Sequence, residues 1–492
     1  MSHPASPASA GGSSRPAFAG LASAVVPGLG HLVIGERRRA LWLFGIDVAL
    51  IAVFLFFFND PVDVITAAVE PSTLALLMIG NILVLGYRVW AADDAYRTAR
   101  TQLGISPGGR SFAVIVGGVG LAIVLLAPHV AFGYYDLVQY NLITTVFGET
   151  ATPTTAPPVS TSAPSPDTGT TTPQTAGDDP TTTTTAAPVA IWDGLGRLNI
   201  LLLGGDFGTG RTGVRTDTMI TVSIDPETGD VAMFSVPRNW TYAPLPAGYG
   251  VWDCDCYPEL INELWVMGEQ HPAAFPGPGT PSENAVKAVN SEFLGIPIHF
   301  YALVNLDGFV DIIDSLGGVE IYVPSLVVDE EYPSEDGTTT ERIEIQPGLQ
   351  EMDGHLALAY ARTRHQDSDY FRMNRQRCVL EAVMEQASPT DLLRNFGTLA
   401  DVIKRSVTTD IPLEALPDLV KLLPNIDREE IVSVRFIPPD YHLKFRDDGK
   451  PGRIANIDLV HEHVELVIDD PDRAVEELGL NRLEDLCGEP PG

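Results

Sequence analysis

The chain has 492 residues, with 31 Lys and Arg against 64 Asp and Glu, and carries a formal charge of −33 at pH 7. Residues 1–148 hold eight residues of each sign, so the entire acidic surplus lies in residues 149–492. Affinity for DNA and RNA backbones comes mainly from cationic side chains, so this acidic body argues against nucleic acid as a partner. Four cysteines in a chain of this length exclude a disulfide-dense scaffold.

Three long apolar runs near the amino terminus predict transmembrane helices. They cover residues 41–58, 73–91 and 112–134, and each has roughly the 20 residues that a helix needs to cross a bilayer. A weaker run at 17–35, broken by Pro27 and Gly28, leaves open a fourth span, a re-entrant hairpin or an interfacial helix. Residues 1–148 are therefore predicted to form a membrane anchor with three or four spans.

The charges of the loops predict the orientation of this anchor. Arginines precede the first run and lie between the second and third, whereas the loop at 59–72 has three acids and no basic residue. By the positive-inside rule the arginine-bearing loops are cytoplasmic, which places the C-terminal part outside a multi-pass cell-membrane protein. Residues 149–190 are dominated by Thr, Pro, Ala and Ser, a composition that predicts a disordered linker.

Residues 191–440 have the pattern of an extracytoplasmic α/β domain, followed by an acidic C-terminal extension at 441–492. Strand-like runs cover residues 198–203, 218–224, 231–236, 298–304, 319–323 and 431–437. Helical patterns cover residues 281–294, with Ser282 as the expected cap, 306–316, 356–362, 371–385 and most of 391–423. The second and third strands are separated by a Gly-bearing loop and predict a β-hairpin. We expect a mixed central sheet flanked by helices on both sides.

Acidic and basic side chains stand at the ends of the first two predicted strands. Asp206 ends the first strand, while Arg215 and Asp217 begin the second and point to the same side if extended. Two carboxylates at adjacent strand ends suit Mg²⁺, which prefers oxygen ligands; the alternative is that they only end a strand and cap a turn. The glycines in loop 204–217 match a dinucleotide motif, but a strand follows where that motif requires a helix, so we reject it.

Arginines gather in two further places despite the negative charge of the domain. Arg238 follows the third predicted strand, and residues 360–377 contain five more: Arg362, Arg364, Arg372, Arg375 and Arg377. Guanidinium groups bind phosphate oxygens in bidentate geometry, so this clustering favours a phosphate or pyrophosphate site. The alternative is a solvated helix face on which the arginines pair with Asp367 and Asp369.

Taken together, these segments resemble the LytR–CpsA–Psr family of membrane-anchored cell-wall enzymes. The resemblance rests on residues 199–206, 214–239, 261–262, 301–324 and 356–377, in this order behind a membrane anchor and a spacer. It departs from the family pattern at Asn239, where many relatives have Asp, and at Leu260, where Lys is frequent. The resemblance identifies residues 191–440 as the catalytic domain.

The family resemblance implies a specific reaction. A glycopolymer moves from a polyprenyl-pyrophosphate carrier to a peptidoglycan hydroxyl, a phosphodiester forms, and polyprenyl phosphate is released. By motif position, Asp206 and Asp217 would hold Mg²⁺, and Asp369 would orient or deprotonate the acceptor hydroxyl. The pyrophosphate would be bound by Arg215, Arg238, Arg362, Arg364 and Arg372, with Arg375 and Gln376 as weaker candidates. The prenyl chain would occupy an apolar pocket whose candidate lining is Leu303, Phe309, Ile312, Ile313 and Leu316.

A second class of function is a non-catalytic, membrane-tethered protein that binds polyprenyl phosphate or wall polymer. In that case the arginine cluster would serve recognition alone. The acid pair Asp206 and Asp217 discriminates between the two hypotheses, because recognition of an anion has no need of a metal-binding pair of carboxylates.

The four cysteines, Cys254, Cys256, Cys378 and Cys487, allow three complete pairings. Disulfides form readily outside the membrane. We expect that the Cys-x-Cys pair does not close on itself, so that Cys254 or Cys256 reaches one of the two distant cysteines. Zinc is the alternative, but the usual Cys-x-x-Cys spacing is missing.

Overall fold

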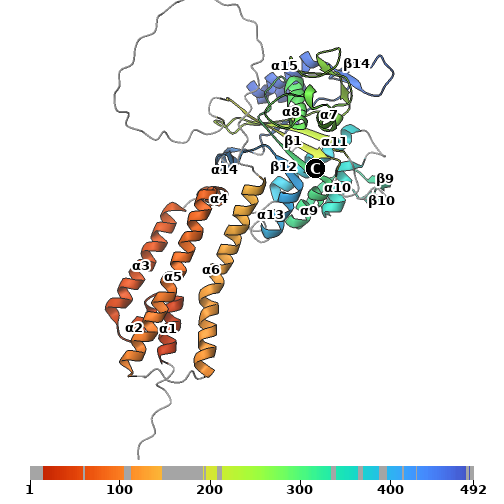
Figure 1. Cartoon of the computed structure of the whole chain (residues 1–492). Coiled ribbons are helices and arrows are strands. Elements are labelled where there is room, and N and C mark those ends of the chain that lie inside the picture. Colours follow the sequence, from red (N-terminus) through yellow and green to blue (C-terminus); the bar gives the residue numbers. More distant parts are fainter. Residues whose placement is uncertain are drawn as a thin grey trace, which may run out of the picture. The chain divides into compact units, whose positions relative to one another are not determined.

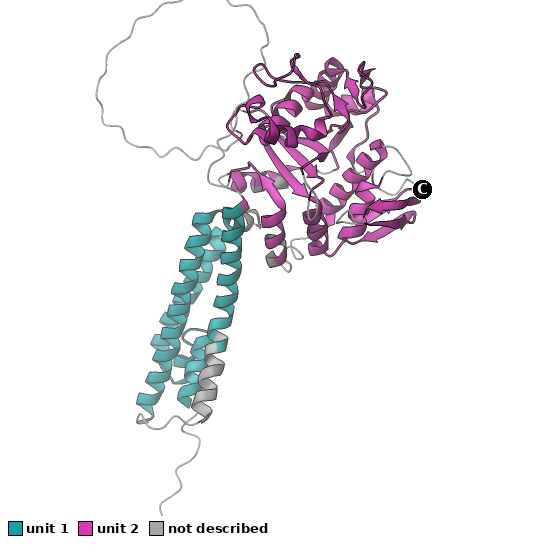
Figure 2. Ribbon diagram, turned by 45° about the vertical axis from the view of Figure 1, so that its right-hand side comes forward, with its two compact units in different colours: residues 1–145 teal, residues 146–492 magenta. Residues whose placement is uncertain are grey.

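The structure is a computed structural model of the whole chain (Figure 1). It describes residues 15–58, 61–104, 112–146, 192, 195–207, 213–333, 339–363, 369–386, 396–412, 415–427, 429–483 and 487. The chain divides into two compact units, residues 1–145 and residues 146–492 (Figure 2). The linker predicted at 149–190 lies outside the described residues.

The first unit is helical. Its helices are α1 (Arg15–Val25), α2 (Leu29–Val33), α3 (Arg37–Phe57), α4 (Pro61–Val69), α5 (Pro71–Gln102) and α6 (Phe112–Val146), of which the last residue belongs to the second unit. The predicted spans at 73–91 and 112–134 fall within α5 and α6, and the span predicted at 41–58 coincides with α3 up to Phe57. By length and composition, α3 and α5 are apolar enough to cross a membrane. Helix α6 has 35 residues and is longer than a span requires.

The weaker apolar run at 17–35 does not form one continuous helix. It is divided into α1, of 11 residues, and α2, of five, on either side of the sequence that contains Pro27 and Gly28. The buried His31 of α2 contacts Asp94 of α5, with 2.9 Å between Nε2 and Oδ2. The two short helices are therefore held against α5, and neither has the length of a span.

The second unit is built on a six-stranded mixed sheet of order β12–β7–β1–β2–β3–β13. In chain order, the strands are β1 (Leu198–Gly205), β2 (Thr216–Ile224), β3 (Val231–Ser235), β7 (Phe300–Asn305), β12 (Val407–Thr409) and β13 (Val432–Arg435). The expected hairpin is present, because β2 pairs antiparallel with β3. Strand β1 is antiparallel to β2 and parallel to β7, so it lies in the middle of the sheet.

Alternating side chains of β1 enter the cores on the two faces of this sheet. Leu201 and Leu203 pack in a core that includes residues of α7 (Leu264–Gln270), α8 (Pro281–Leu294) and α15 (Ile457–Asp469). Leu198 packs in the core on the opposite face. That face is covered by α9 (Leu306–Leu316), α10 (Gly354–Arg362) and α11 (Asp369–Gln386) (Figure 1). The prediction of a mixed sheet with helices on both sides is confirmed.

Two small antiparallel sheets build a further core. Strand β8 (Val319–Val323) pairs with β11 (Gly348–Met352), and β9 (Val327–Pro333) pairs with β10 (Thr340–Ile345). Their inner side chains pack with α10 and α11. The strand predicted at 319–323 therefore forms but lies outside the central sheet. The β9–β10 hairpin was not predicted, because its alternation is interrupted by several charged residues.

The remaining elements connect these layers. The short strands are β4 (Trp240–Thr241), β5 (Ala243–Pro244), β6 (Cys256–Tyr257), β14 (His442–Phe445) and β15 (Arg453–Ala455). The other helices are η1 (Ile261–Glu263), η2 (Pro272–Ala274), α13 (Phe396–Ser406), α14 (Leu416–Leu422), η4 (Leu423–Asn425) and α16 (Pro471–Leu478). Within the described part of 391–423, the expected helices are thus interrupted by β12.

Residues 441–492 are not peripheral to the second unit. Val460, Val464 and Val467 of α15 are buried in the same core as Phe293 of α8. The acidic residues of α15 are exposed, and the valines on the other side of this amphipathic helix complete the core.

The cap of α8 differs from the prediction. Thr280, not Ser282, is the N-cap, and its side chain accepts a hydrogen bond from the Glu283 backbone in a capping box. Ser282 is buried and donates to the Trp265 carbonyl oxygen at 2.7 Å. The reason is Pro281, which is favoured at the first helical position, so the residue before it becomes the cap while the helix keeps its predicted bounds.

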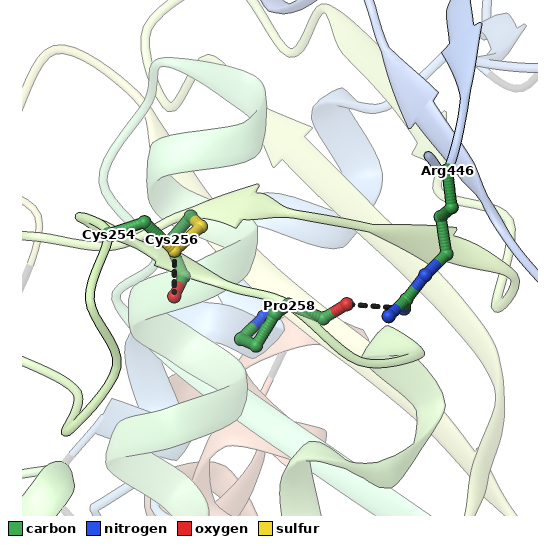
Figure 3. The surroundings of a disulfide bond; sticks show 4 residues. All are labelled: Cys254, Cys256, Pro258 and Arg446. Carbon is green, nitrogen blue, oxygen red and sulfur yellow. Dashed lines mark hydrogen bonds between the residues drawn. A yellow bond between two sulfur atoms is a disulfide. The ribbon is translucent and has the colours of Figure 1, made fainter. Parts of the chain in front are cut away.

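The expected cysteine pairing was wrong. The structure has disulfides between Cys254 and Cys256 and between Cys378 and Cys487. A bend before β6 brings the Cα atoms of Cys254 and Cys256 to 5.1 Å, within the range that a disulfide spans. Two residues further on, the Pro258 carbonyl oxygen accepts a hydrogen bond of 2.5 Å from Arg446 Nη1 (Figure 3).

Candidate active site

The site begins where β1 ends and β2 starts. Because these strands are antiparallel and Gly205 pairs with Thr216, Asp206 and Asp217 stand at the same edge of the sheet. The Asp206 backbone N–H donates to the Arg215 carbonyl oxygen at 2.7 Å, which joins the two strand ends. Both acids line one cleft at this edge.

Asp217 is the centre of a charged network. Arg238, which follows β3, donates to Asp217 Oδ2 through Nη1, and Asn262 Nδ2 donates to Oδ1 at 3.1 Å. Arg372 Nη1 lies 3.5 Å from Oδ2. Burial by itself raises the pKa of Asp217, but the guanidinium charges and these hydrogen bonds more than offset it, and the pKa lies below its usual value. Asp217 is therefore a carboxylate at neutral pH.

Asp369 joins the same two arginines from the first turn of α11. Its Oδ1 lies 3.1 Å from Arg238 Nη2 and 3.1 Å from Arg372 Nη2. The two guanidinium side chains are 16% and 4% exposed, so both charges are largely removed from water and need these carboxylates. Burial lowers the pKa of Arg238, yet Asp217 and Asp369 together hold that pKa above its usual value.

Two other arginines approach from different directions. Arg362, the last residue of α10, lies 3.5 Å from Asp206 between Nη2 and Oδ1. Its guanidinium carbon lies 5.8 Å from the ring centroid of the buried Tyr332. Arg215 is more exposed, and its Nη2 lies 3.4 Å from Glu263 Oε1.

These side chains surround one polar cleft of about 530 Å³. The predicted residues that line it are Asp206, Arg215, Asp217, Arg238, Arg362 and Arg372. Four arginines separated by as many as 157 positions in the sequence thus meet at one place, which is the arrangement that a pyrophosphate site requires. Arg364 lies outside the described residues.

The other predicted residues occupy different positions. Asp369 holds arginines of the cleft but is not among its lining residues. Arg375 is buried and donates from Nε to the Tyr360 carbonyl oxygen at 2.8 Å and from Nη2 to that of Thr363, so it fixes the end of α10 beside α11. Gln376 lines a second cavity.

This second cavity is apolar and has a volume of about 330 Å³. It lies between the sheet, where Ala302 and Val304 face it, and the helices α9, α10 and α11. Of the side chains expected to line an apolar pocket, Phe309, Ile312 and Ile313 do so.

Leu303 and Leu316 are not among the residues that line this cavity. Leu303 is buried in the core on the opposite face of the sheet, because alternate residues of β7 face opposite sides.

The polar cleft and the apolar cavity adjoin each other at the sheet edge. Four residues line both of them: Asp206, Asp217, Arg362 and Arg372. A ligand with an anionic head and a hydrocarbon tail therefore fits the pair of cavities, with its charge at the arginines and its tail under the helices.

Several residues of the cleft were not assigned a role from the sequence. Asn262, Asp329, Glu331, Tyr332 and Thr363 all line it. Asn262 belongs to the Ile-Asn motif at 261–262, which supported the family resemblance but did not predict a role for the Asn262 side chain. The β9 residues carried a signal that was missed: Asp329 occupies an inward position of a strand that starts with buried Val327.

The pair Asp206 and Asp217 could supply some, but not all, of the oxygen ligands that Mg²⁺ needs. Asp206 and Asp217 line one cleft, and Mg²⁺ commonly takes one or two carboxylates and completes its shell with water and phosphate oxygens. Within the described ranges, no group of three or more His, Cys, Asp and Glu side chains is arranged to hold a metal ion. A metal at this position would therefore depend on oxygens of a bound phosphate.

Comparison with known proteins decides the family. The model of the LytR_cpsA_psr family matches residues 167–442, more than half of the chain. The chain belongs to the LytR_cpsA_psr family. The match includes every residue that lines the polar cleft, so the site described above lies within the LytR_cpsA_psr domain.

Among individual relatives, the polyisoprenyl-teichoic acid–peptidoglycan teichoic acid transferase TagU of Oceanobacillus iheyensis is 34% identical over 225 residues, 45% of this chain and 62% of that protein. The polyisoprenyl-teichoic acid–peptidoglycan teichoic acid transferase TagV of Bacillus subtilis is 29% identical over 248 residues, which are 50% of this chain and 58% of that protein. The chain thus spans about three fifths of the length of these relatives. The crystal structure of B. subtilis TagV superposes with a TM-score of 0.40 at 23% identity, covering 56% of this chain and 97% of that one.

Proposed function

We propose that this protein transfers a glycopolymer from a polyprenyl-pyrophosphate carrier to a hydroxyl group of peptidoglycan. Membership of the LytR_cpsA_psr family and similarity to transferases named for teichoic acid and peptidoglycan support this reaction class. The single observation that carries the proposal is the junction of the two cavities. An arginine-lined cleft that shares Arg362 and Arg372 with an adjoining apolar cavity matches a pyrophosphate joined to a hydrocarbon chain.

The proposed step is a phosphoryl transfer with balanced bonds. The acceptor hydroxyl oxygen forms a bond to the phosphorus that carries the polymer, and the bond from that phosphorus to the bridging oxygen breaks. Polyprenyl phosphate leaves with the bridging oxygen, and the hydroxyl proton passes to a base. Such transfers depend on positioned cations around the phosphate oxygens more than on a nucleophilic side chain.

Each arginine has a distinct part in this scheme. Arg238 and Arg372 are held by Asp217 and Asp369, so their guanidinium groups are oriented before the substrate arrives. Pre-oriented charges stabilise a transition state without the cost of reorganisation. Arg362 stands at the entrance of the apolar cavity, where it meets the phosphate nearest the prenyl chain.

Mg²⁺ is part of the proposal. Asp206 and Asp217 would hold it, and when bound it would neutralise charge on the phosphate oxygens. The side chains of the protein still determine where the pyrophosphate lies, because the arginines reach the cleft from four separate segments of the chain.

We further propose a multi-pass membrane anchor with the second unit outside the cell membrane. The apolar helices α3 and α5, the 35-residue α6 and the arginine-bearing loops beside them support this arrangement. A prenyl-linked substrate resides in the same membrane, so an anchored enzyme has high local access to it.

The test uses the full-length chain in detergent micelles with a synthetic polyprenyl-pyrophosphoryl oligosaccharide, Mg²⁺ and soluble peptidoglycan fragments. Mass spectrometry is expected to detect the phosphodiester-linked adduct and an equal amount of polyprenyl phosphate. Donor binding without product would instead favour the non-catalytic binding protein. Release of the oligosaccharide phosphate without adduct would show that water is the acceptor, as in a pyrophosphatase.

A further inference from the structure

Strand β9 lines part of the cleft, and a β-bulge interrupts the strand there. Glu341 pairs with Tyr332 and Ile343 pairs with Asp329, so Glu330 and Glu331 together oppose the single residue Arg342. Bulges break the alternation of a strand and redirect side chains, and they are frequent beside active sites.

The bulge separates two neighbouring glutamates. Glu330 contacts Arg342 at 3.0 Å and is not among the residues that line the cleft. Glu331 lines the cleft. Two residues of the same type, adjacent in sequence and both exposed, thus have different surroundings.

The position of Glu331 is fixed by its neighbours on both sides. Asp329 is 2% exposed and accepts a hydrogen bond from the Thr363 hydroxyl group, and its Oδ1 also accepts from the Glu331 backbone N–H at 3.1 Å. On the other side, Tyr332 is 2% exposed, and Arg362 lies over its ring. Strand β9 is therefore attached to the end of α10 at two consecutive residues, Arg362 and Thr363.

Four acidic side chains line the cleft, and three of them are already engaged. Asp217 pairs with Arg238 and Arg372, Asp206 contacts Arg362, and Asp329 is buried against Thr363. In the part of the chain that the structure describes, no basic side chain lies within 4.0 Å of the Glu331 carboxylate. Glu331 is thus the acid of the cleft that is open to a ligand.

We propose that Glu331 binds the acceptor hydroxyl group and takes its proton during transfer, an assignment that rests on the proposed function. The arginines of the cleft attract the pyrophosphate, whereas the Glu331 carboxylate repels it and attracts the hydrogen of a hydroxyl group, so the two substrates prefer different parts of the cleft. A hydroxyl group placed between them donates its hydrogen bond to Glu331 while its oxygen faces the phosphorus. As the new oxygen–phosphorus bond forms and the bond to the bridging oxygen breaks, the proton moves to the Glu331 carboxylate.

This assignment gives Asp369 a different role from the one that the family resemblance implied. Its carboxylate contacts Arg238 and Arg372, each at 3.1 Å. In the proposal Asp369 is a positioning residue, which acts on the reaction through these two guanidinium groups.

The test compares E331Q with the matched variant E330Q in the full-length chain. For E331Q we expect a loss of transfer rate of about 10²-fold, since general bases contribute at least that much, with donor binding within twofold of the parent. E330Q should transfer at the parent rate, and E331D should recover part of the activity. Both glutamates are exposed, so the melting temperatures serve as a control for folding.

The outcomes separate the two proposals. Transfer by the parent together with equal rates for E331Q and E330Q would overturn the role of Glu331 and leave the proposed function intact. Weakened donor binding in E331Q would also overturn it, because the residue would then belong to the donor site. A parent protein that binds the donor but forms no adduct would refute the proposed function itself.

Discussion

The substitution D217N tests the charged network at its centre. Asparagine retains an oxygen that can accept from Asn262 but removes the negative charge that faces Arg238 and Arg372. Removing one electrostatic contact of this kind commonly slows a reaction by about 10²–10³-fold, so we expect a loss of transfer in that range. Binding of the donor should weaken less, because the four arginines of the cleft remain.

The effect on stability follows from the burial of the two arginines. Breaking a buried ion pair costs about 3–5 kcal/mol when one charge is left uncompensated. Here Asp369 still contacts both guanidinium groups, and the Asp217 side chain is 25% exposed, so a loss of about 1–3 kcal/mol is expected. The protein should therefore remain folded at 25 °C, and the loss of transfer should not reflect unfolding.

The control is D225N, at the opposite end of β2. Asp225 has the same 25% exposure as Asp217 and lies 3.8 Å from Arg197, but it does not line the cleft. The transfer rate, measured by mass spectrometry, should fall for D217N and stay near the parent value for D225N. The melting temperatures of the same samples show whether each variant is folded. Folded D217N that transfers at the parent rate would refute the reasoning.

Three further predictions follow from the same structure. The pKa of Asp217 is held below its usual value in the folded state. The ionised carboxylate therefore contributes its full stabilisation above the usual Asp pKa of about 3.9, and this stabilisation is lost as the pH falls through the lower folded value. The difference in melting temperature between the parent and D217N should accordingly shrink from about pH 5 to pH 3. The variant A302F should exclude two or three methylene groups of the prenyl chain and, at about 0.8 kcal/mol each, weaken binding of long-chain donors about 10- to 60-fold in titrations, with short-chain donors unaffected. In denaturant titrations, replacing Cys378 and Cys487 by serine should lower the free energy of unfolding by about 2–5 kcal/mol. Replacing Cys254 and Cys256 by serine should lower the free energy of unfolding less, because that disulfide spans only two residues whereas the first spans 109.

The sequence alone determined five of the six strands of the central sheet and the helices α8, α9, α10 and α11. Helix α9 has the bounds predicted from the sequence, and in the structure Asn305 caps its first turn while Gly317 ends it in the left-handed conformation. The β2–β3 hairpin followed from two alternating runs around a Gly-bearing loop. The meeting of Asp206 and Asp217 followed as well, since neighbouring strands place their joined ends at one edge.

Other features depended on contacts between residues far apart in the chain. Arg372 reaches Asp217 across 155 positions, and only the packing of α11 beside the sheet decides that contact. The pairing of Cys254 with Cys256 depended on a bend, and the place of Glu331 depended on a bulge in an unpredicted hairpin. Local patterns record which residues prefer a helix or a strand. They do not record which elements face each other, because the burial energy that selects this arrangement is shared among residues from the whole unit.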